Sequence, residues 1–78
     1  MTDELYARYL RARIRESRLQ VRVHLAAARV ARLECGSEDK RLEWSTSYVV
    51  MAKDTRDHTA KLSEYLATAE SRVRLEVP

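Results

Sequence analysis

Glycine and proline are almost missing from this sequence, which contains one of each in 78 residues. A glycine-rich loop of the kind that binds phosphate is therefore excluded. Pro78 occupies the last position, where it cannot interrupt a helix. The composition predicts long, uninterrupted helices without linkers between them.

Cysteine is equally scarce, because Cys35 is the only one and cannot form a disulfide within the chain. A chain this short buries only about 60% of the surface that it exposes when unfolded. Small domains without disulfides usually gain stability from a metal or from oligomerisation. No signal-peptide pattern and no apolar run of about 20 residues is present. We expect a soluble, cytoplasmic protein that does not contact a membrane.

The strongest signal for a break between two helices lies near the midpoint of the chain. Gly36 can adopt the left-handed conformation that ends a helix, and Ser37 can cap the helix that follows. Thr2, followed by two acidic residues, is a second helix-start signal. The sequence therefore predicts an all-α fold, an antiparallel two-helix hairpin. Its single domain spans residues 1–78, with helices at about 3–34 and 38–72, a turn at 35–37 and a tail at 73–78.

Two segments favour a different fold. Residues 19–25 and 73–77 alternate between apolar and polar side chains, a pattern typical of half-buried strands. A small α+β fold with short strands there is the alternative. Helix at 19–25 is favoured by a seven-residue repeat that runs through the segment and comprises Leu5, Ala12, Leu19, Ala26 and Leu33.

Apolar residues predict the helix contacts. The second expected helix has one stripe with alternating spacings of four and three: Trp44, Tyr48, Met51, Thr55, His58, Leu62, Tyr65 and Ala69. The first has two apolar flanks, one of Leu5, Leu19, Val23, Val30 and Leu33, the other of Leu10, Ile14, Val21 and Ala28. One partner helix cannot cover both flanks. We therefore expect a homo-oligomer, with a dimer forming a four-helix bundle favoured. The predicted core or oligomer seam comprises Leu19, Val23, Val30, Leu33, Trp44, Tyr48, Met51, Leu62 and Tyr65.

Arginine is concentrated in the first expected helix. Residues 1–35 hold eight arginines and four acidic residues, a net charge of +4, whereas residues 36–78 have a net charge of −1. Eight positions with alternating spacings of three and four form one row, which we call the Arg ridge: Arg8, Arg11, Arg15, Arg18, Arg22, Leu25, Arg29 and Arg32. Seven of the eight are arginine. The ridge is the candidate binding site.

Three interpretations of the Arg ridge remain open. It can be the solvated face that an amphipathic helix requires. It can bind an acidic protein surface, because arginine makes forked contacts to carboxylates. It can also bind nucleic-acid phosphates, although the modest net charge of +3 and the lack of a known nucleic-acid-binding motif weigh against this.

Catalytic chemistry finds little support. A turn at Gly36 would separate His24 from His58 by about ten residues, roughly 15 Å along the helix axis. Cys35 would lie at a similar distance from His24, too far for a zinc site or a Cys–His pair. The sequence predicts no enzyme activity, no metal or other cofactor and no small-molecule substrate.

These observations predict a small helical interaction or assembly protein that self-associates and binds a protein partner. The alternative is a nucleic-acid-binding accessory or regulatory factor that uses the Arg ridge on phosphates.

Overall fold

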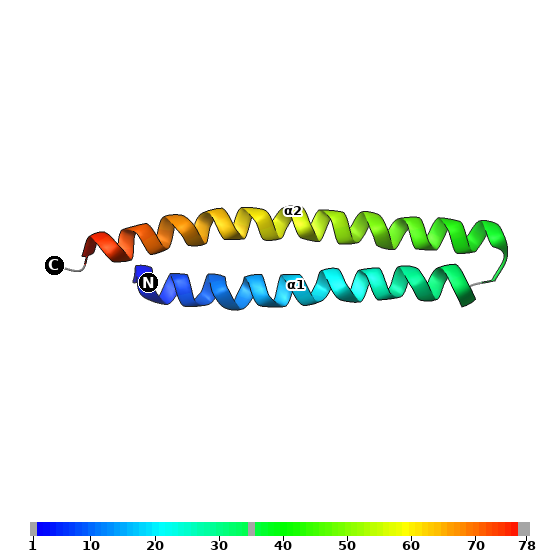
Figure 1. Cartoon of the computed structure of the whole chain (residues 1–78), viewed down its shortest axis with the longest axis horizontal. Helices are drawn as coiled ribbons and strands as arrows, with labels where there is room; N and C mark the ends of the chain where they lie inside the picture. Colours follow the sequence, from blue (N-terminus) through cyan, green and yellow to red (C-terminus); the bar gives the residue numbers. More distant parts are fainter. Residues whose placement is uncertain (1, 35, 77–78) are drawn as a thin grey trace.

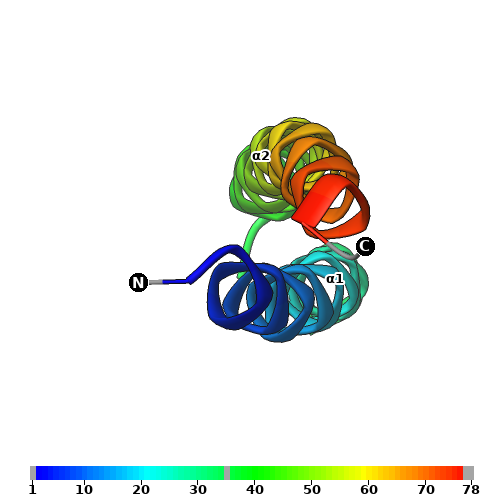
Figure 2. The same cartoon turned by 90° about the vertical axis from the view of Figure 1, so that its left-hand side faces the viewer.

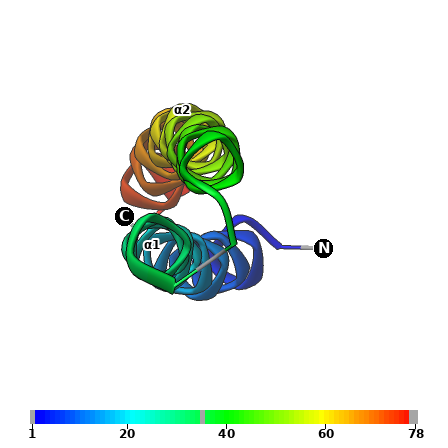
Figure 3. The same ribbon diagram turned by 90° about the vertical axis from the view of Figure 1, so that its right-hand side faces the viewer.

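The computed structural model describes residues 2–34 and 36–76, which form two antiparallel helices lying side by side (Figure 1). Helix α1 spans Asp3–Glu34 and α2 spans Glu38–Glu76. The molecule is a rod with extents of 63 × 15 × 14 Å. Views along the rod show one helix above the other and no further layer among the described residues (Figures 2 and 3). Each helix therefore has only one neighbour.

The helix ends follow the predicted capping signals. The Thr2 hydroxyl accepts a hydrogen bond from the Leu5 backbone N–H at 3.2 Å, and the Ser37 hydroxyl accepts one from the Lys40 N–H at 3.4 Å. Gly36 has φ 57°, in the left-handed region. Because this conformation is costly for residues with a Cβ, a glycine at this position allows the chain to reverse.

The predicted hairpin is present, and its first helix has the expected bounds. The second helix continues to Glu76, beyond the expected end near residue 72. The α+β alternative is not supported: residues 19–25 lie within α1, residues 73–76 lie within α2, and no strand occurs in 2–34 or 36–76. Cys35, Val77 and Pro78 lie outside the described residues.

The contact between the helices is a seam of buried and half-buried residues with alternating spacings of three and four. This is the spacing that keeps one face of a helix against its neighbour. The α1 row contains Ala7, Leu10, Ile14, Ser17, Val21, His24, Ala28 and Ala31, and the α2 row contains Ser45, Tyr48, Ala52, Thr55, Thr59, Leu62, Leu66, Ala69 and Val73.

The apolar core lies near the chain termini. Leu10, Ile14 and Leu62 are its large buried side chains, and Leu66 and Tyr6 pack against them. At mid-length, the Ser17 and Thr59 hydroxyls form a buried hydrogen bond across the seam. Thr59 Oγ1 also bonds the Thr55 carbonyl at 2.8 Å. Because a hydroxyl has one proton, Thr59 donates to this carbonyl and accepts from Ser17.

Candidate interaction surfaces

The Arg ridge lies exposed along one side of α1, where it borders two shallow hollows between the helices. The first hollow has a volume of about 460 Å³ and is lined by Arg11, Arg15, Arg18, Arg22, Ile14, Leu19, Ser63 and Leu66. The second has a volume of about 370 Å³ and is lined by Leu25, Arg29, Arg32, Ala28, Leu42, Ser45, Thr46, Val49 and Val50. Seven of the eight ridge positions therefore line one hollow or the other. Both hollows lie on the same face of the hairpin, which we call the grooved face.

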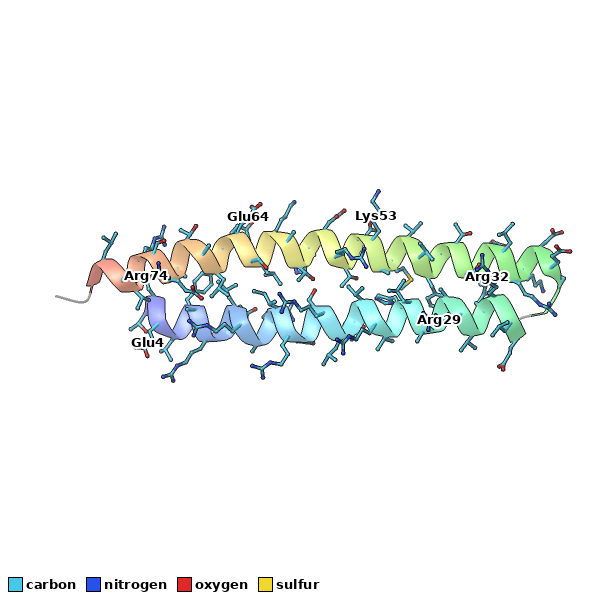
Figure 4. The ribbon with its side chains drawn as sticks, viewed as in Figure 1. Glu4, Arg29, Arg32, Lys53, Glu64 and Arg74 are labelled. Carbon is cyan, nitrogen blue, oxygen red and sulfur yellow. The ribbon has the colours of Figure 1, made fainter. Side chains whose placement is uncertain are left out.

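The two hollows differ in chemistry. Four arginines surround the first hollow over a floor that includes Ile14 and Leu66. The second is mainly apolar, with Arg29 and Arg32 as its two charged residues. These two arginines lie beside the gap between the helices, whereas Lys53 and Glu64 point away from α1 (Figure 4). The grooved face thus has a basic segment at mid-length and an apolar segment toward the turn.

Few ridge arginines have an acidic neighbour. Arg8 pairs with Glu4 at 3.3 Å, and Arg11 pairs with Glu70 across the seam at the same distance. No other ridge arginine forms an ion pair with the side chains of residues 2–34 and 36–75. Exposed pairs of this kind contribute little to stability. Most of the ridge charge therefore remains available to an external group.

A second row of apolar residues runs along α1, about half a helical turn from the seam, on the side away from α2. We call it the outer stripe: Leu5, Tyr9, Ala12, Glu16, Leu19, Val23, Ala26, Val30 and Leu33, with alternating spacings of four and three. All nine residues are exposed and only Glu16 is polar. Because no described residue covers this row, α1 has two apolar faces and one neighbouring helix.

The predicted seam residues fall into three groups. Leu62 is buried and Tyr48 is half-buried between the helices. Trp44, Met51 and Tyr65 lie at the edge of the seam with 44–51% of their surface exposed. The α1 members lie on the outer stripe: Leu19, Val23, Val30 and Leu33. Helix α2 packs instead on the flank that contains Leu10, Ile14, Val21 and Ala28. Whether the exposed members contact another chain stays a prediction.

The two histidines do not lie where the turn position suggests. His24 is half-buried in the seam and His58 is exposed, and both line a third hollow of about 170 Å³. The expected 15 Å separation assumed that the numbers of two residues facing each other across the seam add up to about 72. Ser17 and Thr59 are in contact, however, and their numbers add up to 76. The first turn of α2 extends beyond the end of α1, which shifts the register (Figure 1). No group of three or more potential metal ligands was found among the described residues.

Sequence reasoning missed the residues of α2 that complete the grooved face. Leu42, Val49 and Val50 line the second hollow and Ser63 lines the first. Spacings of seven connect residues 42, 49, 56 and 63, so Arg56 belongs to the same row. This repeat is visible in the sequence, but its position beside the Arg ridge follows only from the register of the hairpin.

Neither described helix has an apolar stretch long enough to cross a membrane. Comparison of the chain with known proteins gave no match among protein-family models, curated proteins or solved structures.

Proposed function

We propose that this protein acts by binding rather than by catalysis, as a small helical interaction or assembly protein that self-associates and binds a protein partner. One observation carries the proposal. Large apolar side chains are mostly outside the contact between α1 and α2: fourteen of them are 38–86% exposed, whereas Leu10, Ile14 and Leu62 are the large ones that are buried.

The distribution of these side chains supports contact with other helices. The outer stripe has the three-and-four spacing by which a helix packs on another helix, and it extends from Leu5 to Leu33, about 42 Å at 1.5 Å per residue. Large contiguous apolar patches on small proteins usually mark binding surfaces. The rod offers a second such surface at the hollow beside Leu42 and Val49. Two separate apolar surfaces provide for both self-association and a different protein partner.

A nucleic-acid-binding accessory factor is the second candidate. It is favoured by Arg15, Arg18, Arg22, Arg29 and Arg32, which form no ion pair within the described ranges. A linear row of unpaired arginines can follow a phosphate backbone.

Sedimentation equilibrium over a range of protein concentrations tests the proposal. We expect a dimer or larger species whose melting temperature rises with concentration, because association stabilises the folded chain by mass action. A monomer at every concentration would contradict the proposed self-association.

Fluorescence anisotropy with labelled DNA and RNA at two salt concentrations tests the second candidate. Tight binding with a steep salt dependence would favour the nucleic-acid function.

A further inference from the structure

We infer that a second copy of this chain packs on the grooved face, antiparallel to the first, so that the turn of each copy lies beside Arg18, Arg22 and Arg56 of the other. The inference rests on the proposed self-association and adds where the copies meet and how they are oriented. It leaves the outer stripe, apart from Leu19 beside the first hollow, uncovered for a different protein partner.

The centre of this contact is the apolar hollow. Leu42 is 64% exposed, Val49 and Val50 are each 51% exposed, and Leu25 is 38% exposed. The floor beneath them includes the small residues Ala28 and Ser45. A large side chain from another helix can enter such a hollow without displacing the seam. Placed on a twofold axis, the hollow of each copy receives the exposed leucines and valines of the other.

The position of the hollow fixes what meets on either side of it. Its α1 residues, from Leu25 to Arg32, are centred about eight residues from the turn, roughly 12 Å along the helix. A twofold axis through this centre places the turn of one copy against the other copy, at a level about eight residues from the centre on the side away from that copy's own turn. This level is that of Arg22 and Arg18. Because facing residue numbers sum to 76, Arg56 lies at the same level on α2.

The charges at these two places are complementary. Residues 34–43 around the turn contain four acidic side chains and two basic ones. None of Arg18, Arg22 and Arg56 forms an ion pair in the described part of the chain. An antiparallel arrangement therefore brings an acidic segment to a basic one twice in each dimer. A parallel arrangement would place turn against turn and arginine against arginine, and such like-charge contacts disfavour association.

The same reasoning disfavours the outer stripe as the contact between copies. Arginines border this stripe along one side, at Arg8, Arg15, Arg22 and Arg29. Two outer stripes packed antiparallel would bring these rows together, because equivalent flanking positions face each other in antiparallel helix pairs. On the grooved face, Arg29 and Arg32 of the two copies also lie near the twofold axis. The acidic turn of each copy meets Arg18, Arg22 and Arg56 of the other, however, and this attraction makes the grooved face the surface on which a second copy fits.

A charge exchange tests the inference. One variant carries Arg18→Glu and Arg22→Glu, a second carries Glu38→Lys and Asp39→Lys, and a third combines all four substitutions. We expect each of the first two to raise the dimer dissociation constant at least about tenfold, and the third to restore it to within about threefold of the native value. Lys61→Glu and Arg72→Glu are the controls, since these exposed residues line neither hollow. Circular dichroism verifies that each variant stays helical.

Distances between spin labels test the orientation independently. In a Cys35→Ser background, a label at Lys40→Cys reports on the turn and one at Ser71→Cys on the terminal end. At 1.5 Å per residue we expect about 25 Å between the two turn labels and about 70 Å between the two terminal labels. Terminal labels closer together than turn labels would overturn the inference. A native dimer that is indifferent to both charge reversals would also overturn it while leaving the proposed function intact. A native chain that is monomeric at every concentration would contradict both this inference and the proposed self-association.

Discussion

The two halves of the hairpin have opposite distributions of large and small residues. In the terminal half, residues 3–18 and 55–76, the buried side chains include Leu10, Ile14 and Leu62. In the turn half, residues 19–34 and 36–54, the buried residues are small: Ala28, Ala31, Ser45 and Ala52. Of the fourteen exposed large apolar residues, ten belong to the turn half.

This difference shows that one seam can have two roles along its length. The terminal half buries large side chains between its own helices, so its contacts account for the cohesion of the single chain. In the turn half, small residues lie between the two helices, and the large apolar residues are mostly exposed. We therefore expect the stability of this half to depend on the proposed second copy, and the following substitutions test this division.

The largest effect is expected for substitutions that remove buried side chains from the terminal half. Leu10→Ala or Leu62→Ala should lower the free energy of unfolding by about 2–5 kcal/mol, because each removes a buried side chain and leaves a cavity. Urea unfolding at one fixed protein concentration measures the loss. Leu33→Ala is the matched control, since this leucine is 73% exposed and should lose little. Equal losses for Leu10→Ala and Leu33→Ala would contradict the assigned core.

A charge placed in the apolar hollow should instead weaken the contact between the turn half and a second copy. Val49→Glu should raise the dimer dissociation constant by about 10- to 100-fold, equivalent to about 1.4–2.8 kcal/mol, because association would bury the carboxylate. The helix content of the single chain should remain, since Val49 is already half exposed. Sedimentation velocity measures the effect, and Ala60→Glu, an exposed position that lines none of the hollows, is the control. Similar dimerisation of Val49→Glu and native protein would place the contact elsewhere.

The turn itself offers a smaller test. Gly36→Ala should cost about 1–2 kcal/mol, because alanine is strained at φ 57°. The space beside the new Cβ is ample, since the nearest side-chain atom is Lys40 Cδ at 3.5 Å. Backbone conformation, and not crowding, should therefore cause the loss. Thermal unfolding measures it, and a fully native melting temperature would show that the turn tolerates another geometry.

The smallest effect is expected at the boundary between the halves. Ser17→Ala removes the donor of the hydroxyl pair but leaves Thr59 bonded to the Thr55 carbonyl. The loss should be about 0.5–1 kcal/mol, the usual net contribution of one hydrogen bond. Urea unfolding can resolve this difference if the denaturant slope stays unchanged. A loss as large as that of Leu10→Ala would mean that the hydroxyl pair also determines the register.

Much of the fold follows from a few residues of the sequence. Thr2, Gly36 and Ser37 predicted the starts of both helices and the turn because capping is a local property. The apolar–polar alternation of residues 73–77 favoured an extended tail, but nothing between residues 73 and 76 interrupts a helix, so α2 continues to Glu76. The strand pattern at 19–25 was overridden by the continuity of α1 around it.

The seam was harder to predict because hydrophobicity and burial diverge in the turn half. Trp44 and Met51 are more apolar than Ser45 and Ala52, yet the latter pair is buried. A stripe chosen for its large apolar residues is therefore rotated away from the true contact. The Arg ridge was visible as a row, but the hollows beside it depend on which α2 residues face it. That register follows from the packing of the seam residues, large in the terminal half and small in the turn half, along the whole hairpin.

We expect the location of the large core residues to determine the order of folding. Hairpins can close from the turn outward, since contacts between residues near in sequence require the least loss of chain entropy. In this chain those early contacts are made by alanine and serine, while Ile14 and Leu62, which belong to the main apolar cluster, are 48 positions apart. The early contacts contribute little burial, so we expect the folding nucleus to require closure of the long loop, which slows folding. During synthesis, we expect the nascent chain to complete this cluster only after α2 has been made through Ala69.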